Sequence, residues 1–545
     1  MKRNSRLILL TLLIFCSTQI KAQVFKVDTL LYNGDPDNRI NLVIMGDGYT
    51  ISDTTLFRTN AMSVMNYFIS TPPFNMYSNF FNFFGIEVIS NESGTDHPGN
   101  ASDESVPLTQ PITIADTYLE TSFDYGLHRV VSSSNLGLIY TVADINFPQY
   151  DIINVIVNSP YYGGSGGGIA FTSMDVAAFE VFMHEFGHSF AGLSDEYEYG
   201  SSNCNPGHSQ YINVSQETDT SLLVWKNWLT TAAIPSTPGT DCNLIGLYPG
   251  AFYCPINWYR PKCNCKMKFL NQPFCEVCAE QIIYKINTLV DLNDNFSPQD
   301  TVLTICNSET QLFTVTQVKS GPNTIQTQWT VDGIPVVNND TAFTFDASLY
   351  APGMHQIIAE SYDSTYEVKK TLTAYRKIWD VNVATPLNDI AFTINGNDLV
   401  SPYTQSQWYI VGDTVPVGST DVLSCTQAGN YFVTGLDING CFATSDTITT
   451  ACTTGLNTIN GNTTEIKIVP NPFTSSMTIY ASGMKSASYR ISVTDLLGQV
   501  LESREINPLS DSFRLELNTI NFQSGIYFLI VSSENSSYSK KMIRE

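Results

Sequence analysis

The sequence centres on residues 181–197, which read VFMHEFGHSFAGLSDEY. His184 and His188 are four residues apart, so on a helix they lie about one turn apart on the same face. Both imidazoles can then reach one zinc ion, which would keep a water in its open position and lower the pKa of that water to roughly 7. Glu185 falls beside this position and can take the proton. The H-E-x-x-H pattern therefore predicts two zinc ligands, His184 and His188, and a general base, Glu185.

A third zinc ligand has to come from outside the histidine pair. Gly192 suits the end of the helix, because glycine readily adopts the left-handed turn that lets the chain double back. In the extended pattern H-E-x-x-H-x-x-G-x-x-H the third ligand follows the glycine by three residues, which here is Asp195. A carboxylate is an acceptable zinc ligand. We predict Asp195 as the third ligand and keep Glu196 as the alternative, because this glycine comes one residue later than in the pattern.

The alternative reading is that H-E-x-x-H arises by chance on a helix whose apolar residues are simply core. The flanking residues argue against it, since two of the six histidines of the chain fall here and the acidic cluster lies where a turn would place ligands. The apolar residues concerned are Val181, Phe182, Met183, Phe186 and Phe190.

Residues 184–197 resemble the active-site segment of the IgA-peptidase family of zinc metallopeptidases, a metzincin-like group. The similarity covers about residues 38–290 and implies a metzincin-like α/β catalytic domain, a Zn²⁺ cofactor and a protein or peptide substrate. It does not imply that immunoglobulin A is that substrate. Three further segments agree with the family: NLVIMGDGYT (41–50), FFGIEVISNESGTDHP (83–98) and YRPKCNCKMKFLNQPFCEVC (259–278).

Three further residues are candidates for supporting roles. The resemblance implies that Met267 belongs to a tight turn beneath the metal, whereas methionine is also ordinary core filling. Tyr197 and Tyr259 could each donate a hydrogen bond to the oxyanion of the reaction. The chain has 28 tyrosines, so structural support is the alternative role for both.

The segments before the active-site stretch predict an α/β sheet. Apolar, β-rich runs at residues 39–46, 83–90 and 151–159 read as buried strands, and Ser52 can begin a helix after the first. The last run leads into YYGGSGGGIAFTS (161–173). Such glycines mark either a flexible loop or a sheet edge that an extended substrate could join as a further strand.

The N-terminus predicts export. Residues 1–22 combine basic residues with an apolar run at 7–16 and a small residue before Gln23, as a secretory signal peptide does. That run is too short to anchor the chain in a bilayer, and we expect no membrane-spanning segment elsewhere. The formal net charge of −24 also argues against nucleic acid or an anionic membrane as a partner.

Seven cysteines lie between residues 204 and 278. The C-x-C and C-x-x-C pairs in residues 263–278 could form a structural zinc site, but export favours disulfides. Because seven is odd, at least one of these thiols is predicted to be free or paired elsewhere.

Beyond residue 297 the sequence changes to short β-rich runs. Two tryptophans followed by turns, in QWTVDG (328–333) and QWYIVGD (407–413), predict two small β-sandwich modules. The second resembles the immunoglobulin-like modules of bacterial surface proteins, so an Ig-like sandwich is expected for both. In the second, Cys425 and Cys441 are expected to bridge, and the modules are expected to act as spacers or to capture substrate. The predicted organisation is a signal peptide (1–22), a metallopeptidase domain (23–297), two all-β modules (298–375 and 376–453), a polar linker (454–465) and a C-terminal domain (466–545).

The C-terminal domain resembles the sorting domain of type IX secretion. The similarity rests on IVPNPF (468–473), YRISVTDLLGQV (489–500), SGIYFLIVSS (524–533) and two lysines near the end. It implies recognition by the type IX machinery and a secreted or surface-held protein. A third adhesive β-sandwich is the alternative.

These observations together predict a secreted zinc endopeptidase. Two other functions remain open from the sequence: a surface adhesin that has lost catalytic activity, and a zinc hydrolase acting on an amide that is not a protein. The intact triplet of His184, Glu185 and His188 argues against the first.

Overall fold

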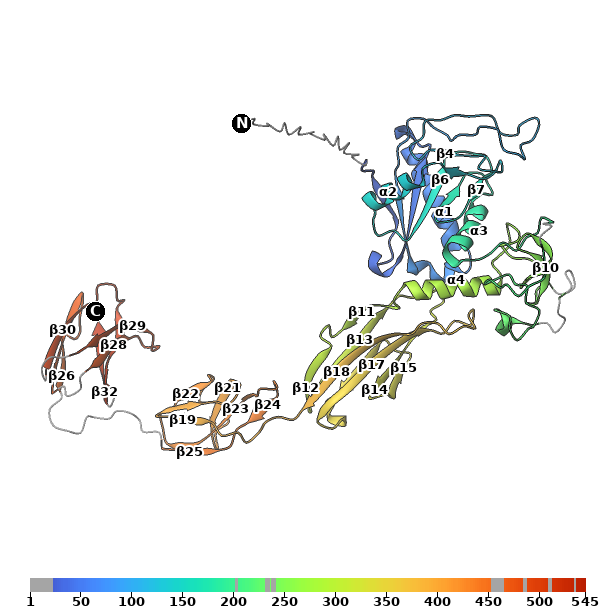
Figure 1. The fold of residues 1–545 in the computed structure, drawn as a ribbon. Coiled ribbons are helices and arrows are strands. Elements are labelled where there is room, and N and C mark those ends of the chain that lie inside the picture. The colour runs from blue at the N-terminus through green and yellow to red at the C-terminus, as the bar shows by residue number, and fades with distance from the viewer. Residues whose placement is uncertain are drawn as a thin grey trace, which may run out of the picture. The chain divides into compact units, whose positions relative to one another are not determined.

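The computed structural model describes residues 23–200, 204–230, 236, 242–451, 465–483, 488–507, 512–533 and 536–545 (Figure 1). The predicted signal peptide, and the predicted linker except its last residue, lie outside the described residues. Strands predominate, with four α-helices in the described part of the chain. The described residues form two compact units, one drawn from residues 1–303, 311–345 and 355–381 and the other from residues 304–310, 346–354 and 382–545.

A six-stranded sheet forms the centre of the N-terminal part. Its order is β1 (Val27–Leu31), β3 (Phe81–Ile86), β2 (Ile40–Asp47), β6 (Ile152–Val157), β8 (Ala170–Thr172) and β7 (Gly164–Ser165). The inner strands run parallel, whereas β1 and β7 are antiparallel to their neighbours. The predicted strands at 39–46 and 151–159 correspond to β2 and β6. The strand predicted at 83–90 begins earlier and ends at Ile86. The glycine-rich segment supplies β7 at the sheet edge.

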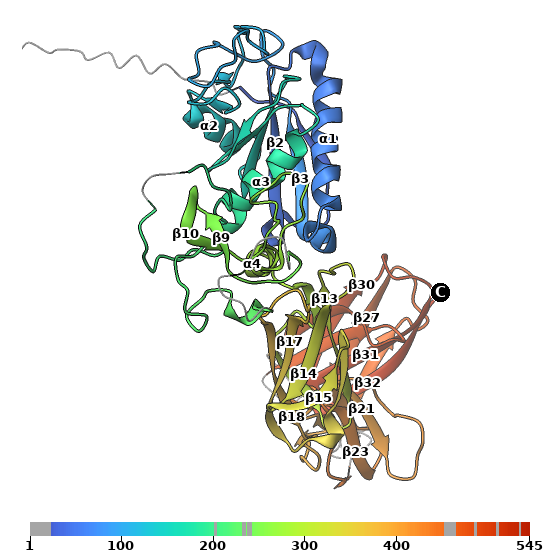
Figure 2. The same cartoon turned by 90° about the vertical axis from the view of Figure 1, so that its right-hand side faces the viewer.

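Helices cover both faces of this sheet (Figure 2). Every residue of β2 is buried, so its alternating side chains enter two separate cores. Leu42 and Ile44 pack with α1 (Thr54–Ser70), α3 (Ala178–Ala191) and α4 (Glu276–Leu289). Val43 and Met45 pack with α2 (Leu136–Asn146) on the other face. Helix α3, which carries His184 and His188, is thus held in place by core packing. The short pairs β4 (Thr121–Ser122) with β5 (Ser132–Ser133), and β9 (Tyr248–Ala251) with β10 (Cys254–Arg260), lie outside this sheet.

The first all-β module consists of two sheets. One contains β11 (Asn293–Ser297), β13 (Thr310–Gln317) and β16 (Ala342–Asp346). The other has the order β12 (Val302–Cys306), β18 (Tyr375–Ala384), β17 (Gly353–Asp363), β14 (Ile325–Val331) and β15 (Ile334–Asn338). The predicted tryptophan, Trp329, stacks on Trp379 at 5.8 Å between ring centroids. Strand β11 lies before residue 298, and β18 begins at residue 375 and ends at residue 384, so the module begins earlier and ends later than the boundaries expected from sequence.

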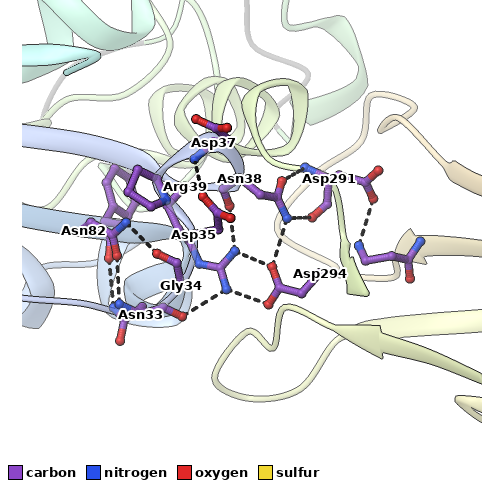
Figure 3. A network of polar contacts seen from close by, with 12 residues as sticks. Asn33, Gly34, Asp35, Asp37, Asn38, Arg39, Asn82, Asp291 and Asp294 are labelled. Atoms are coloured by element: carbon purple, nitrogen blue, oxygen red, sulfur yellow. Dashed lines mark hydrogen bonds and ion pairs between the residues drawn. The ribbon is translucent and has the colours of Figure 1, made fainter. Parts of the chain in front are cut away.

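A polar network joins β11 to the loop that precedes β2 (Figure 3). Buried Arg39 makes a two-pronged salt bridge to Asp294, with N–O distances of 2.6 and 2.7 Å. Asn38 donates to the Asp291 carbonyl and to Asp294, at 3.0 Å each. Such a paired, planar contact fixes orientation as well as distance. The start of the all-β module is therefore attached firmly to the N-terminal domain within the first unit.

The second unit contains the remaining strands. Its first sheets comprise β19 (Thr393–Asn395), β20 (Asp398–Val400) and β22 (Val422–Ser424), and β21 (Thr404–Ile410), β23 (Gly429–Leu436), β24 (Phe442–Thr444) and β25 (Ile448–Thr450). The C-terminal sheets comprise β26 (Glu465–Val469), β27 (Ser476–Ser482) and β30 (Ser512–Asn518), and β29 (Val500–Ile506), β28 (Tyr489–Thr494), β31 (Gly525–Ser533) and β32 (Ser536–Arg544). In the part of the chain that is described, no helix is long and apolar enough to cross a membrane.

One predicted disulfide is wrong. Cys441 is bonded to Cys306, which lies 135 residues earlier, and not to Cys425. The sequence prediction chose partners within one module, but this bond links β12 to the following module. Two further disulfides, Cys204–Cys254 and Cys242–Cys263, lie in the N-terminal domain.

Candidate metal centre

The end of helix α3 sets the geometry of the site. Gly192 has a left-handed conformation with φ of 66°, which a residue with a side chain adopts less readily. The Gly192 amide donates to the His188 carbonyl, and the Leu193 amide reaches back to the Gly187 carbonyl at 3.1 Å. This closed turn reverses the chain after the helix and directs Asp195 back toward the histidines.

Three ligand-type atoms meet at this point. His184 Nε2 and His188 Nε2 lie 3.1 and 3.2 Å from Asp195 Oδ1, and 3.2 Å from each other. The other ring nitrogens face carbonyl oxygens: His184 Nδ1 lies 2.9 Å from the Lys266 carbonyl, and His188 Nδ1 lies 2.7 Å from the Leu193 carbonyl. Each Nδ1 therefore carries the proton, which leaves a lone pair on each Nε2.

This arrangement fits a zinc ion. Two imidazole lone pairs and a carboxylate oxygen repel one another at such distances unless a cation lies between them. Tetrahedral zinc with bonds of about 2.0–2.1 Å separates its ligand atoms by roughly 3.3 Å, close to the distances found here. His184, His188 and Asp195 are thus the residues that could hold the metal. Glu196, the alternative third ligand, points elsewhere, into a group of cysteines.

Two tyrosines lie beside the ligand groups, Tyr253 at Asp195 and Tyr197 at His184. The Tyr253 hydroxyl donates to Asp195 Oδ2, the oxygen that faces away from the histidine pair. The Tyr197 ring lies nearly parallel to that of His184, with a centroid distance of 6.2 Å. Burial and the nearby Asp195 carboxylate raise the pKa of both tyrosines, so both phenols remain protonated donors. The sequence prediction missed Tyr253, because only the fold brings this turn between β9 and β10 to the site.

Glu185 lies in a pocket of about 500 Å³ beside the metal ligands. Burial raises its pKa, while the two neighbouring imidazoles act in the opposite direction. The pocket is also lined by Arg129, Tyr162, Tyr197, Lys268 and Phe269. The glycine-rich segment passes close to the carboxylate, since a Cβ at Gly166 would overlap the Glu185 side chain.

We expect Gly166→Ala to impair Glu185 without removing the metal. The added methyl group pushes the carboxylate from its position, and a shift of about 1 Å in a catalytic group costs up to roughly a hundredfold in rate. We predict that kcat falls about 10- to 100-fold, while zinc content stays that of the wild type. Gly137→Ala on helix α2 is the matched control, because its Cβ meets only one atom, at 4.0 Å. Unchanged kcat in Gly166→Ala would contradict the contact.

Two other predicted residues occupy different places. Met267 is fully buried beneath α3, and a Cβ at Gly187 would lie 2.8 Å from its sulfur. Met267 thus packs against helix α3 at Gly187, the residue before His188. Tyr259 instead lines a separate pocket with His208 and Asn257, so it does not meet the metal ligands.

Two family models match the sequence. Residues 29–244 match IgA Peptidase M64, and residues 467–545 match the Secretion system C-terminal sorting domain. No curated protein matches the chain.

Solved structures with detectable similarity include fibronectin(III)-like modules of Clostridium thermocellum CbhA, with 16% identity over 16% of this chain and 94% of that chain, at a TM-score of 0.13. SGBP-B of a Bacteroides ovatus mixed-linkage glucan utilization locus shares 13% identity over 46% of this chain and 67% of that chain, at a TM-score of 0.12. A Parabacteroides merdae β-glucuronidase shares 11% identity over 52% of this chain and 27% of that chain, at a TM-score of 0.15. Scores this low carry no argument about this chain.

The first matched range contains helix α3 and Asp195, and the second contains the strands from β27 to β32. The sorting domain indicates export to the cell surface or the medium by type IX secretion. The chain therefore combines a segment similar to the IgA Peptidase M64 family, at residues 29–244, with a segment similar to the secretion system C-terminal sorting domain, at residues 467–545.

Proposed function

We propose that this protein is an exported zinc endopeptidase in which Glu185 is the general base. The observation that carries the proposal is the convergence of His184 Nε2, His188 Nε2 and Asp195 Oδ1 within 3.2 Å of one another. The family match supports peptidase activity, and this set of ligand groups supports a bound metal ion.

Each residue of the site has a separate role in the proposed peptide hydrolysis. When bound, zinc supplies Lewis acidity toward a water molecule and the substrate carbonyl. Glu185 accepts the proton of the attacking water and can pass it to the leaving amine. The Lys266 and Leu193 carbonyls hold the imidazoles in the tautomer that leaves each Nε2 free. Tyr197 lines the same pocket and can donate a hydrogen bond to the oxyanion.

Three features support a metzincin-like arrangement. The third ligand follows a glycine turn by three residues, as the sequence pattern predicts. Met267 lies beneath the histidine helix. Strand β7 is at the edge of the described sheet, and Gly166 follows it directly beside Glu185, so an extended peptide could pair with this edge.

The all-β modules are proposed to act as spacers between the peptidase domain and the sorting domain. The first module supports this role, because the Arg39–Asp294 salt bridge fixes its start to the catalytic domain. The type IX machinery is the partner that the sorting domain implies.

Removal of zinc should abolish hydrolysis of a labelled casein substrate. We expect dialysis against a strong chelator to reduce activity at least about a hundredfold, and stoichiometric zinc to restore it, because no other described group in the pocket can replace the metal's Lewis acidity. Metal content is measured on the same samples. Full activity in a chain free of metal would overturn the proposal. Zinc binding without cleavage of casein or a diverse peptide library would favour the adhesin or the hydrolase of a non-protein amide.

A further inference from the structure

A second group of metal-ligand side chains lies next to the peptidase site. It comprises Glu196, Cys265, Cys275 and Cys278, and one ligand atom from each lies within 4.8 Å of the others. All four residues are buried. The three cysteines are free thiols, whereas Cys263, two residues before the first of them, is bonded to Cys242. The sequence favoured disulfides for the cysteines of residues 263–278. That prediction is confirmed for Cys263 but is wrong for Cys265, Cys275 and Cys278.

The distances fit a tetrahedral metal site. Cys265 Sγ lies 3.7 Å from Cys278 Sγ, and Cys278 Sγ lies 3.4 Å from Glu196 Oε1. A tetrahedral zinc ion with bonds of about 2.3 Å to sulfur and 2.0 Å to oxygen separates two sulfurs by roughly 3.8 Å and a sulfur from an oxygen by roughly 3.5 Å. A disulfide would require about 2.05 Å between sulfurs.

The buried carboxylate of Glu196 also supports a cation at this place. Glu196 is completely buried, and its Oε2 has no hydrogen-bond partner in the described structure. Oε1 accepts from the Asn213 side chain at 2.9 Å. Leaving a buried carboxylate oxygen unpaired costs free energy, which a metal ion at this place would offset.

The local fold presents the thiols together. Cys275 is the N-cap of α4 and Cys278 lies in its first turn, so the C-x-x-C spacing places both on one side of the helix start. Cys265 begins the turn in which the Lys268 and Phe269 amides donate to its carbonyl at 2.9 Å. We propose that Cys265, Cys275, Cys278 and Glu196 bind a second, structural zinc ion.

This zinc would stabilise the peptidase site without taking part in the reaction. Glu196 directly follows the ligand Asp195, and its amide donates to the Met267 carbonyl at 2.9 Å. Lys266, next to Cys265, provides the carbonyl that orients His184. A metal held by four residues from these segments would fix the third ligand and the histidine support relative to each other.

The test counts zinc in full chains purified without chelator or reductant. The wild type should hold two zinc ions per chain. The double variant His184→Ala, His188→Ala should hold one zinc ion, the one bound by the thiols. The double variant Cys275→Ser, Cys278→Ser should lose that ion and keep the one at the histidines. Cys306→Ser with Cys441→Ser is the control, because it removes two sulfurs from a disulfide in the other unit and should lose none. A folded histidine double variant without any zinc, or with iron in its place, would overturn the proposal.

Two measurements decide the matter even if the cysteine variant does not fold. Cobalt exchanged into the histidine double variant should give the near-ultraviolet charge-transfer absorption of thiolate ligands. Alkylation of the denatured, chelated wild type should label all three thiols, as mapped by mass spectrometry. Absence of the absorption, or a disulfide between any two of the three, refutes the site. The two proposals can fail independently. If the wild type held a single zinc ion and the histidine double variant kept it, the thiolate site would stand and the zinc site of the peptidase would be refuted.

Discussion

Glu185→Gln is expected to abolish proteolysis while leaving the zinc in place. The amide has nearly the shape of the carboxylate but cannot accept the proton of the attacking water. General-base catalysis contributes about 10²–10⁴-fold, so kcat should fall by that factor. The metal should stay, because Glu185 is not among the three converging ligand groups. The measurements are kcat on a labelled peptide and zinc content of the same preparation.

A matched control separates this effect from a change of charge. Glu92→Gln makes the same substitution at an exposed glutamate, and the amide oxygen can still accept from the Asp116 amide as the carboxylate does at 2.8 Å. It should keep the kcat of the wild type. If Glu185→Gln kept activity within a few-fold of that control, another group would have to be the base.

The local part of the site could be predicted from sequence because helix geometry alone determines it. His184 and His188 face the same way in any α-helix, and Glu185 follows from its position between them. Asp195 could be predicted because a glycine turn has a defined geometry, which Gly192 adopts with φ of 66°. These inferences needed no knowledge of the rest of the chain.

The remaining parts of the site depend on contacts between distant segments. Tyr253 reaches Asp195 across 58 residues, and Cys278 reaches Glu196 across 82. No periodicity or spacing encodes such pairs. Tyr259 was predicted as a hydrogen-bond donor at the site because its hydroxyl has suitable chemistry. Strand β10 instead places it at another pocket, which the sequence alone does not show.

The predicted limits of the first all-β module differ from the observed ones because strand pairing also depends on distant segments. Composition changes near residue 297, yet β11 already belongs to the all-β module from residue 293. Strand β18 continues to residue 384 because it pairs with β17 and β12 on its two sides. The Cys306–Cys441 bond likewise joins segments that the sequence assigns to different modules. Strand pairing and disulfide choice are decided by tertiary partners.

Asp195→Ala is expected to remove the zinc held by the histidine pair. The substitution leaves two protein ligands and also removes the charge that balances the metal. Changing a group that only supports a ligand weakens metal binding by about 10- to 100-fold, so loss of a ligand should exceed about a hundredfold. The chain should retain one zinc fewer than the wild type after dialysis against a weak chelator. Activity should be lost in the same step.

Tyr253→Phe provides the graded comparison for this prediction. It removes only the hydroxyl that donates to Asp195 Oδ2 and keeps the carboxylate facing the histidines. Zinc affinity should therefore fall about 10- to 100-fold, between the wild type and Asp195→Ala. The order of the three chains in a chelator titration tests the assignment, because a supporting role for Asp195 would make the two variants equal. The assignment of Asp195 rests on its Oδ1, which lies 3.1 and 3.2 Å from the two Nε2 atoms. If Asp195→Ala bound zinc as tightly as Tyr253→Phe, the third ligand would have to be another residue.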